Sequence, residues 1–281
     1  MASPGLPFTM KTIASRQNPI VRTFRDLADR PDPQGVRLLL DGAHLVREAL
    51  DAGLAFEHVC VAASLLDRNG EEAALAAALE GRGIEVTAAA DPLMAALSPV
   101  RTSSGIVAIA TRRERVSRID DIAAAADAML LLGMDIQDPG NVGALVRVAE
   151  AAGAGAIVLA GESANPFSWK ALRGSMGSAM RLPVVNGVSP DGALESLRTY
   201  EIRTVAAVAR GGPSPDQLRW PSRVAIVVGG EGPGLSDAIV AKCDERVTIP
   251  MAPPVESLNV AVAAAILLYV ARSCRAGRQP R

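Results

Sequence analysis

The alternation of apolar and polar positions divides the chain into two stretches in which strands and helices follow one another. In the first stretch the pattern predicts two helices, at 44–52 and 71–79, and four strands, at 36–41, 58–62, 84–87 and 105–110. In the second stretch short apolar runs predict strands at 128–132, 156–159, 184–185, 203–208 and 224–228. Uninterrupted apolar runs are typical of parallel strands that are buried on both faces. We therefore expect an α/β fold with two domains, the second built on a parallel sheet.

A charged stretch at 111–121, without apolar periodicity, separates these two halves. We interpret 112–125 as a linker between a smaller α/β domain at 11–111 and a larger one at 126–273. Residues 274–281 form a basic tail that can bind phosphate nonspecifically or serve as a disordered, solubilising end.

Composition and charge limit the possible partners. Hydrophobic residues make up 49% and charged residues 21% of the 281 residues, which is typical of globular proteins. The formal net charge of −1 excludes a global electrostatic signature of nucleic-acid binding, so any contact with RNA must be local. A local group of four basic residues occurs near the N-terminus, but two acidic residues interleave with it, which favours a solvated face: Arg16, Arg22, Arg25 and Arg30, with Asp26 and Asp29.

The cysteine and histidine content gives no metal-ligand spacing, and we expect no metal. The three cysteines lie far apart, which favours a reducing compartment over a disulfide framework. The N-terminal segment has no apolar stretch typical of a signal peptide, and no long uncharged apolar run suggests a membrane span. We therefore expect a cytoplasmic protein.

Three segments carry candidate chemistry, and the first runs from 135 to 147, directly after a predicted strand. Asn141 is a good N-cap for the helix that follows, and Gly143 lets another backbone or a ligand come close. Arg147 lies six residues after Asn141. Taken alone, this segment is compatible with an ordinary strand–turn–helix junction.

The second segment, 229–236, places four glycines within six residues after a predicted strand. A glycine loop at the carboxyl end of a strand is where α/β folds bind nucleotides, although this spacing fits neither the Rossmann nor the P-loop pattern. Glu231 within the loop disfavours a phosphate and suits a ligand with positive charge, such as a sulfonium. The simpler alternative is a glycine-rich turn.

The third segment, 247–260, ends with Ser257 and Asn259 at the mouth of an apolar helix. Helix capping explains one of these polar residues but does not explain both.

Together the three segments resemble the motifs of the SpoU (TrmH-like) branch of the SPOUT methyltransferases, and the match covers 128–272. The motifs are Asn141-x-Gly143-x-x-x-Arg147, then Gly229-x-Glu231-Gly232-x-Gly234, then Ile249-Pro250-Met251 with Ser257-Leu258-Asn259-Val260. The first half is similar to the family's RNA substrate-binding domain, with Asp41-Gly42 where many relatives have Glu-Gly. A second departure is Pro253-Pro254, which replaces a usual glycine.

The resemblance implies a catalytic domain with a C-terminal trefoil knot at which S-adenosylmethionine (AdoMet) binds. Relatives are obligate homodimers in which the partner helps to complete the site, and the apolar helix at 258–270 is our candidate for the interface. The cofactor-binding residues implied are Asn141, Gly229, Gly230, Gly232, Ile249, Met251 and Leu258.

The implied reaction is methylation of a ribose 2′-hydroxyl in structured RNA. Arg147 would bind the adjacent phosphate and polarise the hydroxyl, because a guanidinium stays charged. Ser257 and Asn259 would position the nucleophile and the methionine end of AdoMet. Glu231, water or phosphate could accept the proton, and Glu231 could equally just brace its loop.

Ribosomal RNA is the first substrate we expect, followed by transfer RNA. The alternatives are a non-catalytic RNA-binding or ribosome-assembly factor of the same fold, and a small-molecule enzyme that uses another nucleotide. Absence of AdoMet binding would argue against the methyltransferase.

Overall fold

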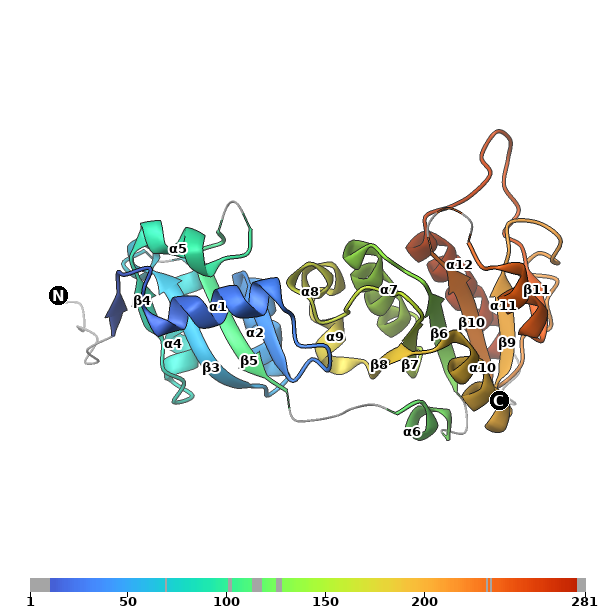
Figure 1. The fold of residues 1–281 in the computed structure, drawn as a ribbon, viewed down its shortest axis with the longest axis horizontal. Coiled ribbons are helices and arrows are strands. Elements are labelled where there is room, and N and C mark those ends of the chain that lie inside the picture. Colours follow the sequence, from blue (N-terminus) through green and yellow to red (C-terminus); the bar gives the residue numbers. More distant parts are fainter. Residues whose placement is uncertain are drawn as a thin grey trace. The chain divides into compact units, whose positions relative to one another are not determined.

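The computed structural model describes residues 11–68, 70–100, 103–112, 118–124, 128–230, 232 and 234–276, and the chain forms two compact units divided between 113 and 114 (Figure 1). The elements of the first unit are β1 (Thr12–Ile13), α1 (Pro19–Asp29), β2 (Arg37–Asp41), α2 (Ala43–Asp51), β3 (Ala55–Ala62), α3 (Ala63–Leu66), α4 (Glu71–Glu80), β4 (Thr87–Ala89), α5 (Asp91–Leu97) and β5 (Ile106–Thr111). Its five strands form a mixed sheet in the order β1-β4-β3-β5-β2.

The sheet of the first unit is held by apolar side chains and by one buried carboxylate. Asp41, at the end of β2, is 8% exposed and accepts hydrogen bonds from the hydroxyls of Ser98 (2.5 Å) and Ser104 (3.1 Å). A buried carboxylate needs such partners, because burial of an unpaired charge is costly. Asp41 thereby fixes both ends of the connection between α5 and β5.

The second unit contains a six-stranded sheet in which every pair of neighbouring strands is parallel, in the order β11-β9-β10-β6-β7-β8. This confirms the expected parallel sheet, whereas the trefoil knot stays a prediction. Its elements are α6 (Ile119–Ala123), β6 (Met129–Met134), α7 (Pro139–Ala151), β7 (Ala156–Ala160), α8 (Trp169–Ser175), α9 (Ser178–Arg181), β8 (Val184–Val188), α10 (Pro190–Thr199), β9 (Arg203–Ala207), β10 (Val224–Gly229), α11 (Asp237–Lys242), β11 (Glu245–Val247) and α12 (Val260–Ala276).

Apolar strands explain why helices cover both faces of this sheet. Every residue of β6 and β7 is buried, so neither face of these strands contacts solvent. The alternate residues of β6 that include Leu130 and Leu132 share a core cluster with Leu194 and Leu197 of α10. Helices α7 and α12 pack against each other and against strands β7 and β10, respectively.

The helix that starts the first motif differs from the expectation in its cap. The side chain of Asp138, not that of Asn141, caps α7, and it accepts a hydrogen bond from the backbone N–H of Asn141 at 3.0 Å. The prediction that Asn141 is the N-cap was therefore wrong. Pro139 occupies the first turn, where its missing N–H costs nothing, and this moves the start of the helix back.

Close backbone packing explains the glycine of the first motif. A Cβ on Gly143 would lie 2.3 Å from the carbonyl oxygen of Ala171, so α7 and α8 approach each other closely at this point. Another backbone, rather than a ligand, requires the glycine.

Candidate active site

A cavity of about 580 Å³ lies at the carboxyl ends of β9, β10 and β11. These strands are parallel neighbours, so their ends meet at one edge of the sheet, where open α/β sheets bind ligands. The lining includes eight of the predicted site residues: Gly229, Gly230, Gly232, Ile249, Met251, Ser257, Leu258 and Asn259. Residues from the second and third motifs are therefore brought together around one space.

The glycine loop of the second motif is packed backbone against backbone. A Cβ on Gly229 would lie 2.3 Å from the carbonyl carbon of Gly234, where the loop folds back over the end of β10. A Cβ on Gly230 would lie 2.2 Å from the carbonyl oxygen of Asp135, which follows the neighbouring strand β6. These glycines are required by packing at the edge of the cavity, and a plain turn would not require both.

Replacing Gly230 with Ala is expected to lower the free energy of unfolding by about 1–3 kcal/mol, because the new methyl group must displace backbone. Gly155→Ala is the matched control: its Cβ would meet nothing closer than the Met129 carbonyl at 4.0 Å. Urea denaturation measures both. Equal stability of the two variants would contradict the packing argument.

Asn259 connects the third motif with the first. Its Oδ1 accepts hydrogen bonds from the backbone N–H groups of Ala261 (2.9 Å) and Val262 (3.3 Å), which caps α12. Its Nδ2 donates to Oδ1 of Asn141 at 2.9 Å. Because the helix uses the oxygen of Asn259, only its amide nitrogen can face Asn141. Among the described residues, none accepts a hydrogen bond from the amide nitrogen of Asn141, and Asn141 itself does not line the cavity.

Ser257 and Leu258 precede this cap and line the cavity. Because Asn259 caps α12, helix capping does not explain the presence of Ser257. Ser257 makes no hydrogen bond with the described residues. Pro253 and Pro254, joined by a cis peptide bond, are exposed and lie between Met251 and Ser257 on the same loop. Both ends of the loop therefore reach the cavity, Met251 from one end and Ser257 with Leu258 from the other.

The structure does not bring Arg147 to this cavity within one chain. Arg147 is exposed on α7 and pairs with no group in the described ranges. It lies about 9 Å along the helix axis from Asn141 and about 120° around it, as six helical residues dictate. Glu231 lies outside the described residues, so its expected role stays a prediction.

Three charged residues that the sequence analysis did not single out also line the cavity: Arg210, Asp237 and Arg246. Arg210 lies beyond the end of β9, and its guanidinium is 3.5 Å from the carboxylate of Glu256 in the loop before α12. Their positions in the sequence could have identified them, since Arg210 follows the end of β9, Asp237 starts α11 and Arg246 lies in β11.

Asp244 fixes the edge strand that borders the cavity. Its carboxylate accepts hydrogen bonds from the backbone N–H and the hydroxyl of Thr204, each at 2.8 Å, which ties the start of β11 to β9. Burial opposes ionisation of Asp244, but the hydrogen bonds from Thr204 and the positive charge of Arg203 outweigh it and lower the pKa of this carboxyl.

Asp244→Ala is expected to reduce the free energy of unfolding by about 1 kcal/mol at pH 7, because Thr204 loses both bonds. The lowered pKa means that this stabilisation is complete above the unfolded value of about 3.9 and is lost as the pH falls through the folded pKa. Urea denaturation at pH 7 and in acid measures the effect. The control, Glu195→Ala, removes an exposed ion pair with Arg198 and should change little at either pH. A pH-independent difference between wild type and Asp244→Ala would contradict this.

Two further findings concern the described ranges as a whole. No group of three or more His, Cys, Asp or Glu side chains there could hold a metal ion. None of the helices in those ranges combines the length and the hydropathy needed to span a membrane.

The fold and the cavity define an α/β protein with a ligand site at the carboxyl edge of a parallel sheet, and comparisons with known proteins agree. The SpoU rRNA Methylase family model matches residues 128–269. The chain belongs to this family, which confirms the resemblance seen in the motifs.

Similarity extends over nearly the whole chain. A Synechocystis protein named as an uncharacterized tRNA/rRNA methyltransferase, slr1673, is 32% identical over 93% of each chain. The 23S rRNA (guanosine(2553)-2′-O)-methyltransferase RlmP of Bacillus subtilis is 30% identical over 92% of this chain and 98% of its own. Among solved structures, an RNA 2′-O ribose methyltransferase matches with a TM-score of 0.81 and 31% identity, covering 94% of this chain and 99% of its own. The AdoMet-bound rRNA methyltransferase of Sinorhizobium meliloti matches with a TM-score of 0.79 and 27% identity, covering 94% and 98%.

Proposed function

We propose that this chain transfers the methyl group of AdoMet to a ribose 2′-hydroxyl of RNA. The observation that carries the proposal is the hydrogen bond between Asn141 and Asn259, because it joins the first motif to a cavity built from the other two. Relatives over the full length that are named RNA 2′-O-methyltransferases support the same activity.

The cavity suits AdoMet in size and in chemistry. Its volume of about 580 Å³ lies within the range of small-molecule sites. Apolar side chains that can contact an adenine ring line it, among them Val208, Val228, Ile249 and Leu258. Gly229 and Gly230 line the cavity and are only partly buried, so their main-chain groups can recognise the nucleoside. We therefore assign cofactor binding to Gly229, Gly230, Gly232, Ile249, Met251 and Leu258.

Bound AdoMet supplies an electrophilic methyl group, and the residues of the chain align the ribose with it. Alignment of two reactants is itself a large part of catalysis in such transfers. Ser257 lines the cavity, and Asn141 is hydrogen-bonded to the lining residue Asn259, so we assign the Ser257 hydroxyl and the Asn141 amide to stabilise the 2′-oxygen as its negative charge develops. Asn259 acts through Asn141, whose orientation it fixes.

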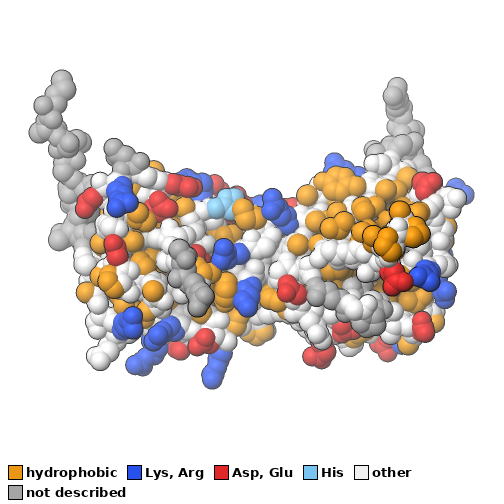
Figure 2. Space-filling view, turned by 90° about the horizontal axis from the view of Figure 1, so that it is seen from above, with side chains coloured by type: hydrophobic (Ala, Val, Ile, Leu, Met, Phe, Trp, Pro, Cys, Tyr) orange, Lys and Arg blue, Asp and Glu red, His pale blue; other side chains and the backbone are white. Residues whose placement is uncertain are grey.

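A second copy of the chain explains the position of Arg147. The exposed side of α12 carries Val262, Ile266 and Tyr269, which are 48%, 36% and 48% exposed and follow one helical face. Figure 2 shows hydrophobic side chains gathered on the second unit. We assign this face to a homodimer in which Arg147 of one protomer completes the cavity of its partner and binds the RNA phosphate. A cytoplasmic location and independence of metal stay expectations.

Ribosomal RNA is our first assignment for the substrate, with transfer RNA second. The test is incubation with labelled AdoMet and total RNA from a strain that lacks the enzyme, followed by mapping of the labelled nucleotide. Label on a ribose 2′-oxygen of rRNA is expected. Label on tRNA would correct the substrate, and no AdoMet binding by calorimetry would refute the function.

A further inference from the structure

The turn that follows β9 brings an arginine to the cavity of the second unit, and both ends of this turn are anchored. The N–H of Val208 donates to the carbonyl of Val247, the last residue of β11, at 2.9 Å. The N–H of Gly212 donates to the hydroxyl of Thr248 at 3.0 Å. Arg210 lies midway between these anchors and lines the cavity. The backbone that carries Arg210 is therefore already ordered, so a ligand does not have to order it on binding.

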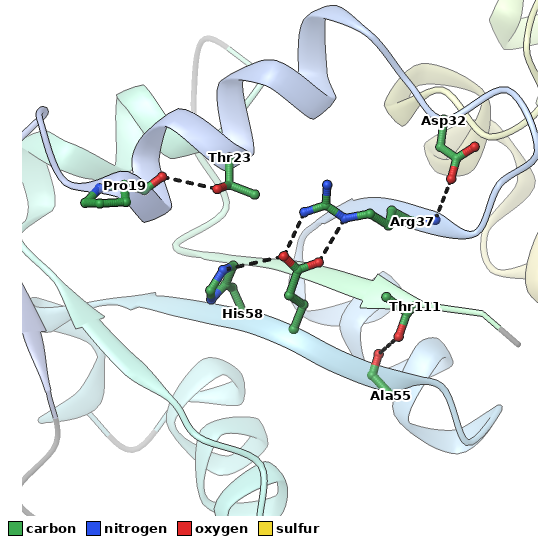
Figure 3. Close-up of polar contacts among 8 residues, drawn as sticks. Pro19, Thr23, Asp32, Arg37, Ala55, His58 and Thr111 are labelled. Atoms are coloured by element: carbon green, nitrogen blue, oxygen red, sulfur yellow. Dashed lines mark hydrogen bonds and ion pairs between the residues drawn. The ribbon is translucent and has the colours of Figure 1, made fainter.

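The ion pair of Arg210 leaves most of its guanidinium unused. Its Nη2 lies 3.5 Å from Oε1 of Glu256, which is the one polar contact that this side chain makes with the described residues. Arg37 in the first unit is different, since its Nε and Nη2 donate to both carboxylate oxygens of Glu57, at 2.9 and 2.8 Å (Figure 3). The side chains of Arg210 and Glu256 are 83% and 80% exposed, so their pair contributes little to stability. A second carboxylate can therefore bind Arg210.

The contact with Glu256 places this guanidinium near the end of the cavity where the methyl group reacts. Glu256 directly precedes Ser257, which is assigned to the 2′-oxygen that accepts the methyl group. That methyl group is bound to the sulfur of AdoMet, and the α-carboxylate belongs to the methionine on the same sulfur. Arg246, the other cation of the lining, has no comparable contact with this loop among the described residues. Arg210 is therefore the cation that the structure holds next to the methionine end.

We propose that Arg210 binds the α-carboxylate of AdoMet, an inference that rests on the proposed function. The cofactor-binding residues assigned above offer main-chain and apolar groups, which do not distinguish AdoMet from an adenosine derivative without an amino acid. Arg210 makes this distinction, because a guanidinium and a carboxylate form parallel, charge-assisted hydrogen bonds. It is thus a specificity-determining residue that selects the complete cofactor over methylthioadenosine, which lacks the amino-acid end.

The test is calorimetric titration of the full-length protein with two ligands that transfer no methyl group, S-adenosylhomocysteine and methylthioadenosine. Both contain the adenosine and a thioether, but only S-adenosylhomocysteine carries an α-carboxylate. Arg210→Gln should raise the dissociation constant of S-adenosylhomocysteine about tenfold, the loss typical of one hydrogen-bonded charge pair. The dissociation constant of methylthioadenosine should stay within about twofold of the wild-type value, which also shows that the variant is folded.

Two control variants separate the carboxylate contact from other effects of the substitution. Glu256→Gln removes the ion pair but keeps the guanidinium, so wild-type affinity for both ligands is expected. Arg219→Gln removes the same charge from the same connection between β9 and β10, at an exposed position that does not line the cavity. It should also bind both ligands like wild type.

Three results would overturn the proposal. Arg210→Gln could weaken both ligands equally, or Glu256→Gln could reproduce its loss, and either result would mean that Arg210 only braces its loop. Unchanged affinity of Arg210→Gln for S-adenosylhomocysteine, with weaker filter binding of RNA, would assign Arg210 to an RNA phosphate instead. Failure of the proposed function is distinguishable from these results, because wild type would then bind neither ligand.

Discussion

Replacing Arg147 with Ala is expected to lower kcat for RNA methylation by about 10³-fold, the loss typical of removing a group that stabilises developing negative charge. The affinity for AdoMet should not change, because Arg147 is assigned to the RNA phosphate and not to the cofactor. Single-turnover methylation and calorimetric titration with AdoMet measure the two quantities separately. Retained activity would contradict the role assigned to Arg147.

A mixed dimer tests whether Arg147 acts across the interface. Co-expression of Arg147→Ala with Asn259→Asp under two different affinity tags gives heterodimers in which one cavity is intact and faces an intact Arg147. Such heterodimers should regain about half of the wild-type activity, since a two-fold dimer has two equivalent sites. A heterodimer as inactive as both parents would place Arg147 in its own protomer's site.

Asn259 carries two tasks, and two substitutions separate them. Asn259→Ala should lose about 1 kcal/mol of stability, because α12 loses its cap. Asn259→Asp keeps a capping oxygen, so its free energy of unfolding should stay within about 0.5 kcal/mol of wild type. Both variants lose the amide donor that orients Asn141, and both should lower kcat by about 10²-fold or more.

Urea denaturation and methylation kinetics, measured on the same preparations, check this division. The expected result is an inactive but stable Asn259→Asp. Full activity of that variant would mean that Asn259 is only a helix cap, and the hydrogen bond to Asn141 would then carry no catalytic meaning.

Apolar runs predicted the strands of the second unit well, since a strand that is buried on both faces has a clear pattern. Strand β11 was missed because Glu245–Val247 lies at the sheet edge, where only Val247 is buried. The strand expected at 84–87 is found at Thr87–Ala89, because its three small, buried residues give no alternation. Helix α1 was missed although Val21, Phe24 and Leu27 recur at helical spacing, because its charged residues suggested a solvated surface.

The motifs supply ten of the 21 residues that line the cavity, and the glycines among them lie at the end of a strand, a position that the sequence pattern can predict. They did not predict that Asn141 and Asn259 would be hydrogen-bonded across 118 residues, since such a contact depends on tertiary structure. The same holds for Arg210 and Glu256, whose ion pair joins two loops. The sequence did not predict that Arg147 lies outside the cavity of its own chain either, since the direction of its side chain depends on how α7 packs in the fold.

Helix α12 is capped by the cavity residue Asn259 and carries Val262, Ile266 and Tyr269 on its exposed side. A ligand that orders the first turn of this helix therefore orders the surface assigned to the second copy. Thermodynamic reciprocity then requires that AdoMet tighten dimerisation by the same factor by which dimerisation tightens AdoMet binding. Dilution of the protein until the assigned dimer dissociates should accordingly raise the apparent dissociation constant for the cofactor.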